Sequence, residues 1–513
     1  MTDRVISRPP APNAVNVLLV GVAGGLAAFV ALTVIAMSRN SGAFEYALDD
    51  VYIHLAVAGE IARGGYGVNP GEVASAASSP LYPFLLTPFA GTSLQRWLPL
   101  IWNVIALSVA SALFALVMVR AGLGRVGAVL ATAAPFALAT YVTAFTGMEN
   151  MAHVAASLAT VLGLWHFVQT DRIGGFLIAG VVFATALRLE GLALGMAAGG
   201  VVALSGRTGA GLGLMALAVL PAVLFVLFLM WLGLDPLPNS ITAKLQDTGP
   251  VGVIGKFQLN IATYGGRYLL VLAVVVLLVS IALYSRDRRV GLFGLAVAAV
   301  GLAHLAFGSI GWMDRYETYA NVSLVAALAL LLGSTTSPMQ VLAVSLALAG
   351  GVVTYAPYAL SVYAWNPAAI AAQHAQLARL ASDHINAPVA VNDIGYVAWA
   401  DPDYVLDLWG LASSEALSVR LAEPDDGWAG PLVSKRGIPL AMIYDNWLGD
   451  AVPKDWRRLG SLHLEIPNAF LGGREVAFYA TGTTVVGDLK KAITEWQPGL
   501  PSRARFEWAE ETE

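Results

Sequence analysis

The chain has 513 residues, of which 57% are hydrophobic and only 12% are charged, and its net charge at pH 7 is −5. A soluble domain carries about 25% charged residues, so this composition excludes an ordinary soluble enzyme and predicts an integral membrane protein. The absence of cysteine excludes disulfides and thiolate metal sites, and no basic stripe indicates a nucleic-acid partner.

Apolar segments follow one another through the first 365 residues. They lie at Val15–Met37, Trp97–Val119, Val126–Ala144, Met151–Val168, Gly174–Leu187, Gly191–Leu204, Leu212–Leu232, Ile261–Leu283, Val290–Phe307, Ala320–Leu332 and Val341–Tyr363. A helix needs about 20 residues to cross a membrane, and most segments approach that length. The first segment is too long for a signal-peptide core, so we expect an uncleaved anchor. Residues 1–365 are therefore predicted to form a polytopic α-helical membrane domain with about 11 transmembrane helices.

Residues 366–513 have a different character, with 12 Lys/Arg and 20 Asp/Glu, about half of the charged residues in the chain. A helical pattern at Ala368–Ile385 precedes strand-like runs at Val389–Val391, Tyr404–Leu406, Leu440–Tyr444 and Val476–Tyr479, with helices near Ser413–Leu421 and Val486–Trp496. This alternation predicts a small water-exposed α/β domain. Pro501–Glu513 is expected to be a fraying tail.

Basic residues occur at every second turn of the membrane domain. They are Arg4 and Arg8, Arg120 and Arg125, Arg172, Arg207, and the cluster Arg286–Arg289. Cytoplasmic turns carry the excess of Lys and Arg, so we expect a cytoplasmic N-terminus and an extracytoplasmic C-terminal domain. The polar loops then lie on the outer face of a bacterial inner (plasma) membrane. These loops are residues 38–96 (the first external loop), 146–150, 188–191, 235–244 and 311–319.

The first external loop carries two adjacent carboxylates, Asp49 and Asp50, at the start of a helix-like run. Carboxylates at a membrane edge are costly unless they have a function. Neighbouring residues on a helix lie about 100° apart, so we expect only one of the two to face a cavity. The loop continues through Asn69-Pro70-Gly71-Glu72 to Ser79-Pro80-Leu81.

This loop resembles the first external loop of the GT-C glycosyltransferases, and more narrowly that of the AftB-type arabinofuranosyltransferases and their bacterial relatives. The matching residues are Asp49, Asp50, Tyr52, Ile53, Asn69, Pro70, Gly71, Glu72, Ser79, Pro80 and Leu81. The chain departs from the family at His54-Leu55, where an aromatic–Arg pair is frequent, and at Ala76-Ala77, which replace a Gly-Tyr-like pair.

Two later loops carry further charged residues that resemble the family. Thr146-Gly147-Met148-Glu149-Asn150 is similar to its Thr/Ser-Gly-Met-Glu-Thr loop, and Glu149 either faces the cavity or complements a helix dipole. Arg188-Leu189-Glu190-Gly191 is similar to its Arg-Pro-Glu-Gly loop. Arg188 and Glu190 either contact a ligand or form a structural pair.

Three more stretches resemble the family. Pro236–Lys244 is similar to Pro-x-Pro-Asn-Ser/Thr-x-x-x-Lys and supplies Asn239 and Lys244. Lys244 either reaches a phosphate or extends to the membrane interface. Arg315, between Trp312 and Tyr316, can clamp a phosphate, whereas its aromatic neighbours can also be ordinary interface residues. In the C-terminal domain, Asn392, Asp393, Asp407 and Trp409 are acceptor-side candidates, and turn-forming roles are equally open for them.

The resemblance implies an inverting glycosyltransferase that moves a sugar from polyprenyl phosphate to a cell-envelope glycan or glycolipid. Arabinofuranose, as in arabinan of the cell wall, is the favoured sugar, and mannose or another hexose is the alternative. Asp49 and Asp50 are the catalytic candidates; Asp49 is expected to be the base, and Asp50 either caps the following turn, orients a neighbour or itself takes a catalytic role. Arg188, Lys244 and Arg315 are expected to bind the phosphate, and the remaining donor-site candidates are Glu149, Glu190, Tyr52, Asn69, Glu72 and Asn239.

A transporter or flippase for lipid-linked sugars is the rival class. Such proteins place polar groups near the bilayer midplane, whereas the charged groups here lie at one face, which favours transfer. Lone histidines such as His54, His153 and His304 show no ligand spacing. The sequence therefore indicates no metal or other cofactor, although it leaves a divalent metal open. The expected partners are the lipid-linked donor, the acceptor and the lipid bilayer.

Overall fold

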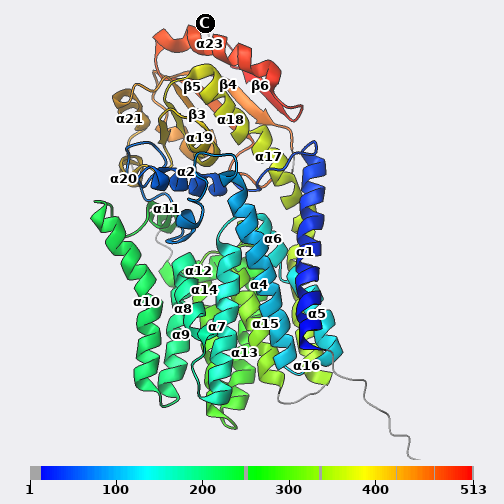
Figure 1. Ribbon diagram of the computed structural model, residues 1–513. Helices are drawn as coiled ribbons and strands as arrows, with labels where there is room; N and C mark the ends of the chain where they lie inside the picture. The colour runs from blue at the N-terminus through cyan, green and yellow to red at the C-terminus, as the bar shows by residue number, and fades with distance from the viewer. Residues whose placement is uncertain (1–12, 248–251, 334–337, 423, 467, 511–513) are drawn as a thin grey trace, which may run out of the picture.

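The computed structural model describes residues 13–247, 252–333, 338–422, 424–466 and 468–510. Figure 1 shows two layers, a bundle of long helices and an α/β domain stacked on one end of it. We call this α/β portion the cap domain. A short helix, α2 (Asp50–Ala62), lies across the end of the bundle beneath the cap domain (Figure 1).

The bundle is built from apolar helices. They are α1 (Ala14–Arg39), α4 (Leu98–Arg120), α5 (Gly124–Ala137), α6 (Thr140–Phe145), α7 (Asn150–Thr170), α8 (Gly175–Leu187), α9 (Gly191–Leu204), α10 (Thr208–Trp231), α13 (Tyr264–Tyr284), α14 (Arg288–Phe307), α15 (Thr318–Leu332) and α16 (Pro338–Ser361). Every residue of α15 is buried, so this helix is the centre of the bundle, in accord with its apolar character on all sides.

Among the described residues, seven helices are long and apolar enough to cross a membrane. They are α1, Gln95–Arg120, α7, α10, α13, α14 and the stretch that begins at Pro338, and α8, α9 and α15 are shorter apolar helices. Each of the eleven expected apolar segments falls on helices of the bundle. The segment Val126–Ala144 is broken, because Pro135 lies in the last turn of α5 and Ala139 adopts a left-handed conformation (φ 54°) before α6.

Shorter helices lie at the cap end of the bundle. They are α2, α3 (Tyr82–Leu85), η1 (Gln95–Trp97), α11 (Asn239–Asp247), α12 (Gly252–Ala262) and η3 (Tyr363–Trp365). Nine of the 13 residues of α2 are buried, because the bundle covers one side of this helix and α19 of the cap domain (Gly395–Ala400) covers another. The start of α2 is therefore fixed by both layers.

The cap domain contains a six-stranded mixed sheet and its surrounding helices. The strands are β1 (Val389–Val391), β2 (Val405–Asp407), β3 (Leu440–Ile443), β4 (Arg457–Leu464), β5 (Glu475–Ala480) and β6 (Ala504–Trp508). The helices are α17 (Asn366–Ala372), α18 (His374–Leu380), the π-helical turn η4 (Ala381–Ile385), α19, α20 (Ser414–Leu421), α21 (Ala429–Lys435), α22 (Asp445–Leu448), η5 (Gly449–Ala451), η6 (Thr483–Val485), α23 (Val486–Trp496) and η7 (Gln497–Gly499).

The strand order is β2-β1-β3-β5-β4-β6, with β1 parallel to β2 and β3 and the other pairs antiparallel. The expected strands coincide with β1, β2, β3 and β5, but the sequence reading missed β4 and β6. The expectation of a fraying tail from Pro501 is wrong for residues 504–508, which pair with β4. Ala504 and Phe506 are buried while Arg505 and Glu507 are exposed, which is the alternation of an edge strand.

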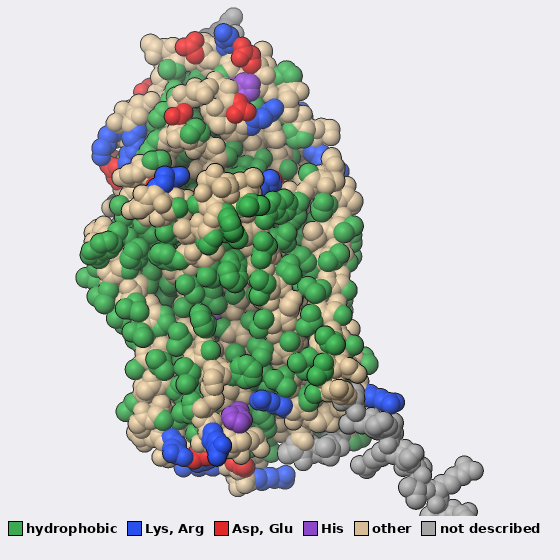
Figure 2. Space-filling view, viewed as in Figure 1, with side chains coloured by type: hydrophobic (Ala, Val, Ile, Leu, Met, Phe, Trp, Pro, Cys, Tyr) green, Lys and Arg blue, Asp and Glu red, His purple; other side chains and the backbone are tan. Residues whose placement is uncertain are grey.

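Charged residues mark the end of the bundle opposite the cap domain. On the face shown in Figure 2, apolar side chains cover the bundle, and Lys and Arg gather at its lower end as well as above it. Asp171 at the α7–α8 turn pairs with Arg207 (2.5 Å) and with Arg289 (3.1 Å), which joins three of the arginine-bearing turns. Arg4 and Arg8 lie outside the described residues.

Candidate active site

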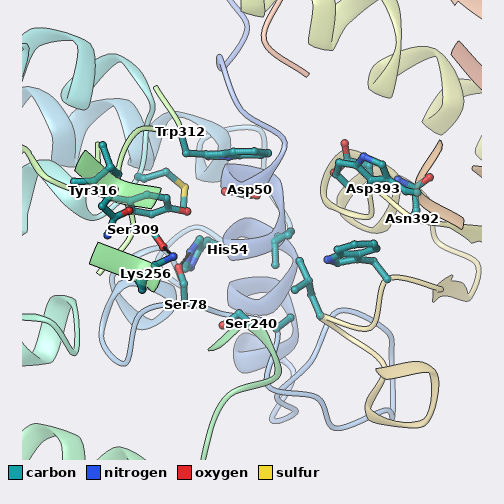
Figure 3. A pocket seen from close by; sticks show the side chains of 18 residues that line it. Asp50, His54, Ser78, Ser240, Lys256, Ser309, Trp312, Tyr316, Asn392 and Asp393 are labelled. Carbon is teal, nitrogen blue, oxygen red and sulfur yellow. Dashed lines mark hydrogen bonds between the residues drawn. The ribbon is translucent and has the colours of Figure 1, made fainter. Parts of the chain in front are cut away.

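A cavity of about 510 Å³ lies between the bundle and the cap domain. Its lining includes Asp50, Ile53, His54, Ala76, Ser78, Met148, Ser240, Lys256, Asn260, Ser309, Ile310, Trp312 and Tyr316 from the bundle side, and Asn392, Asp393, Trp409, Leu411 and Trp447 from the cap domain. In Figure 3, Lys256, Ser309, His54 and Ser78 lie on one side and Asn392 and Asp393 on the other, with Asp50 between them. The volume lies within the range of pockets that bind small molecules.

Asp50 is the first-loop carboxylate that faces this cavity. It begins α2, keeps 29% of its side chain exposed and forms an ion pair with Arg315, which is 2% exposed. The Arg315 guanidinium also packs over the Tyr316 ring, 5.0 Å from its centroid. Its Nε and Nη1 atoms have no hydrogen-bond partner among the described residues. Asp50 and Arg315 thus place opposite charges side by side at the cavity wall.

Asp49 is absent from the cavity lining, although we expected it and not Asp50 to face the cavity. Its side chain is 6% exposed, and its Oδ2 and Oδ1 atoms accept hydrogen bonds from the backbone N–H groups of Gly395 (2.6 Å) and Tyr396 (2.7 Å). Burial raises the pKa of Asp49, while nearby His374 and the two N–H donors oppose that change. The physical reason is the 100° step along α2, which turns one carboxylate to the cap domain and the next one to the cavity.

Behind the cavity, Arg188 lies between two carboxylates. Its Nη1 atom is 2.7 Å from Glu149 Oε1, and its Nη2 atom is 2.6 Å from Glu190 Oε1. Glu149 is completely buried and also lies 3.7 Å from His54 Nε2 and 3.3 Å from Ser78 Oγ, two groups that line the cavity. Burial alone would raise the pKa of Glu149, but Arg188 and His54 outweigh it and hold the pKa below its usual value. The two loops therefore form one buried ionic network.

The structure adds a cation that the sequence reading did not single out. Lys256 of α12 lines the cavity, half-buried, with Nζ 3.5 Å from Ser309 Oγ, and burial lowers its pKa. Lys256 belongs to none of the motifs that resemble the family. The amphipathic pattern of its helix, α12, was the feature of the sequence that could have drawn attention to it. Lys244 lies on α11, but its side chain is outside the described residues. Asn239 is buried and bonds to Ser75 and Ser414, so it positions α11 instead of lining the cavity.

The cap domain contributes the opposite wall. Asp393 follows β1 and accepts a hydrogen bond from His374 (2.8 Å), while the amide oxygen of Asn392 accepts from the Tyr444 N–H. Trp409 and Trp447 lie with their ring centroids 4.9 Å apart. Carbohydrate rings stack well on such aromatic faces, so this wall offers both stacking and polar contacts.

Asp407 does not reach the cavity. Its carboxylate accepts hydrogen bonds from the backbone N–H groups of Trp409, Gly410 and Ala412, and burial raises its pKa to about 6. This is the turn-forming role that the sequence left open. The turn holds the Trp409 side chain against the cavity.

Three other first-loop candidates join the loop to the cap domain. Asn69 exchanges two hydrogen bonds with the backbone of Val405 in the edge strand β2, at 2.9 and 3.0 Å. Glu72 accepts from the Tyr404 hydroxyl at 3.0 Å. Tyr52 is fully buried, donates to Glu45 and packs on the Tyr396 ring. The structure gives these residues docking contacts and does not place them in the cavity lining.

A helical membrane bundle, a first loop with an acidic start and a cap domain over the resulting cavity define a multi-pass membrane protein with an α/β domain at one end of its bundle. ArnT from Cupriavidus metallidurans in the apo state is similar in structure, with a TM-score of 0.50 and 13% sequence identity over 91% of this chain and 99% of that chain. The crystal structure of the same protein bound to undecaprenyl phosphate gives a TM-score of 0.45 and 11% identity over 91% of this chain and 98% of that chain. The likeness to the apo structure, at a TM-score of 0.50, confirms the expected fold class, a helical membrane domain of the GT-C type followed by an α/β domain.

Within the cap domain, residues 366–479 match a family described as a domain of unknown function (DUF8728). No curated protein matches the chain. At the identities of the solved structures, the likeness concerns the fold, and the site must be argued from this chain's own residues.

Proposed function

We propose that this chain is a glycosyltransferase that moves a sugar from a polyprenyl-phosphate donor to a glycan or glycolipid acceptor. The observation that carries the proposal is the cavity at the junction of the bundle and the cap domain, where Asp50 and Arg315 form an ion pair and Lys256 lines the same space. A donor with a lipid tail can approach from the bundle while its headgroup enters the cavity. The GT-C fold type supports the same class.

Asp50 is the proposed base, a role that we transfer from Asp49 because of the geometry. It lies in the cavity lining, and its ion pair with Arg315 orients the carboxylate so that it can accept the proton of the acceptor hydroxyl. The sugar's anomeric carbon then changes its bond from the phosphate oxygen to the acceptor oxygen in one displacement, with inversion. The lipid phosphate leaves with the electron pair of the broken bond.

The leaving phosphate gains charge in this step, and the cations of the bundle side stabilise it. Lys256 is the cation in the cavity lining, and Arg315 keeps two donor nitrogens without a protein partner among the described residues. Charge-assisted contacts of this kind act on the departing oxyanion. Arg188 supports them indirectly, since its two described carboxylate contacts occupy both terminal nitrogens.

The favoured donor sugar is arabinofuranose, by resemblance of the first loop to the AftB-type enzymes. Two departures from that family, at His54 and Ala76, lie in the cavity lining. Because the cavity wall differs from that family at these positions, mannose and other hexoses are included among the candidate sugars. The acceptor would stack on Trp409 and Trp447 and bond to Asn392 and Asp393. With the arginine-bearing turns on the cytoplasmic side, transfer takes place on the outer face.

The test uses purified full-length protein, a panel of polyprenyl-phosphate pentoses and hexoses, and a glycan acceptor. We expect transfer from one donor class, and Asp50→Asn should slow turnover about 100- to 10,000-fold, the range of general-base contributions. Asp171→Asn is the matched control, because Asp171 pairs with arginines at the far end of the bundle. Movement of the lipid-linked sugar across the membrane of proteoliposomes, without any transfer to the acceptor, would refute the proposed glycosyl transfer and favour a flippase.

A further inference from the structure

A cluster of three potential ligands lies where the first loop meets the cap domain. Asp49 comes from the start of α2, His374 from the start of α18, and Asp393 from the end of β1, and one ligand atom of each lies within 4.8 Å of the others. The chain separates the first two of these residues by more than 300 positions. The spacing of these residues in the sequence does not predict the site, because only the docking of the cap domain brings the three together.

The cluster carries more negative than positive charge. Asp49 is 6% exposed and His374 is 0% exposed, while 27% of the Asp393 side chain is exposed. In the part of the chain that the structure describes, neither carboxylate forms an ion pair with Lys or Arg, and His374 is the one basic side chain that contacts Asp393. With both carboxylates ionised, the cluster has a net charge of about −1 or −2 in a largely buried place, and a bound cation would offset that charge.

The distances suit one small cation. Ligands at about 2.1 Å from a metal lie about 3.0 Å apart when adjacent and up to about 4.2 Å apart when opposite each other. The His374 Nε2 to Asp393 Oδ2 distance is 2.8 Å, and the upper limit of 4.8 Å exceeds the opposite-ligand distance by about 0.6 Å. Small side-chain shifts would therefore complete the geometry.

Neighbouring groups hold the three ligands in place. The N–H groups of Gly395 and Tyr396 orient Asp49, and the Tyr444 hydroxyl lies 3.3 Å from Asp393 Oδ2. A Cβ atom at Gly395 would lie 2.2 Å from the Asp49 carbonyl oxygen and 2.7 Å from its Oδ2, so this close approach requires glycine. Supporting hydrogen bonds to ligating carboxylates are a usual feature of metal sites.

We infer that Asp49, His374 and Asp393 bind a divalent cation of mixed nitrogen and oxygen preference, such as Mn²⁺, at the edge of the cavity. Three protein ligands leave open positions, and Asp393 lines the cavity, so the cation would offer these positions to a substrate oxygen, either of the phosphate or of a sugar hydroxyl. This role for a substrate oxygen rests on the proposed glycosyl transfer. The binding of the cation itself does not.

The experiment measures cation binding without turnover. Full-length protein is stripped with EDTA, desalted and titrated with Mn²⁺, and free Mn²⁺ is followed by its electron paramagnetic resonance signal. We expect one Mn²⁺ per chain, with the dissociation constant raised at least 10-fold in Asp393→Asn and in His374→Gln. Asp445→Asn, a surface carboxylate of the same domain that pairs with Arg458, should bind like the parent.

Folding and function are controlled separately. Each variant must keep the parent's thermal transition in EDTA, and Asp393→Asn is the main variant because its side chain is partly exposed. Asp50→Asn should bind Mn²⁺ normally and yet fail in transfer, which separates the cation site from the proposed base. If no stoichiometric Mn²⁺ binds, or if Asp393→Asn binds as tightly as the parent, the cation site is refuted whatever the transfer assay gives.

Discussion

Removing the charge of Glu149 should destabilise the protein more than removing that of Glu190, although both contact the same guanidinium. Glu149 is 0% exposed and lies 2.7 Å from Arg188, whereas the Glu190 side chain is 36% exposed and lies 2.6 Å from it. The substitutions Glu149→Gln and Glu190→Gln keep the size of the side chain and one acceptor. They differ in how much water compensates the lost charge.

The expected magnitudes follow from this difference in burial. Breaking a buried ion pair by removing one partner costs about 3–5 kcal/mol. Arg188 keeps its contact with Glu190 in Glu149→Gln, so we expect the lower end, about 3 kcal/mol. A partly exposed pair contributes about 1 kcal/mol or less, so Glu190→Gln should cost about 1 kcal/mol. The two variants should differ by about 2 kcal/mol.

The free energy of unfolding can be measured by denaturant titration in detergent micelles, with the 13 tryptophans as the fluorescent probe. A double-mutant cycle with Arg188→Met should give a coupling energy for Glu149 of more than about 1 kcal/mol, because residues in one network are not additive. Equal losses in the two Gln variants, or a larger loss in Glu190→Gln, would contradict the idea that burial of Glu149 sets the strength of this network.

Three further results are expected. Gly395→Ala should lower the free energy of unfolding by about 1–3 kcal/mol, because the new Cβ atom would meet Asp49. Gly487 has open space around it, so Gly487→Ala should be neutral or stabilising. Similar losses in the two variants would refute the close contact at Gly395. Burial and nearby Asp314 raise the pKa of Glu317 to about 8, so the contribution of this residue to the free energy of unfolding is greatest below pH 4.5 and is lost as the pH rises through 8. Glu317→Gln should flatten this fall in the free energy of unfolding with pH, and an unchanged pH profile in the variant would contradict the prediction. In the cysteine-free chain, a membrane-impermeant maleimide should label Gly487→Cys but not Ser285→Cys in intact cells, and the reverse pattern would overturn the orientation.

The helices of the bundle could be predicted from the sequence because apolar runs of membrane length have few alternatives to a helix. The interruption near Ala139 was missed, since a single left-handed residue leaves no mark in hydropathy. In the cap domain, strands β1 and β3 are short, buried apolar runs and were found. Strands β4 and β6 were missed because β4 begins with Arg457 and Arg458 and β6 carries Arg505 and Glu507, so neither reads as an apolar run.

The site could be predicted in part for a similar reason. Motif residues such as Asp50 and Trp409 lie in the cavity, but Asn69 and Asp407 have the same appearance in sequence and serve as docking and turn residues. Family-like motifs mark positions where the backbone is constrained, and that constraint arises equally from a substrate and from a domain contact. Lys256 belongs to no motif, so only the three-dimensional arrangement brings it to the cavity.

The two adjacent carboxylates link these observations. The sequence could predict that only one of them faces the cavity, but the choice depends on the rotation of α2 about its axis. That rotation is fixed where the Asp49 carboxylate meets the N–H groups of Gly395 and Tyr396 in the cap domain. The same contact that docks the cap domain therefore aims Asp50 at the cavity, so a change that loosens the docking should also misplace the proposed base.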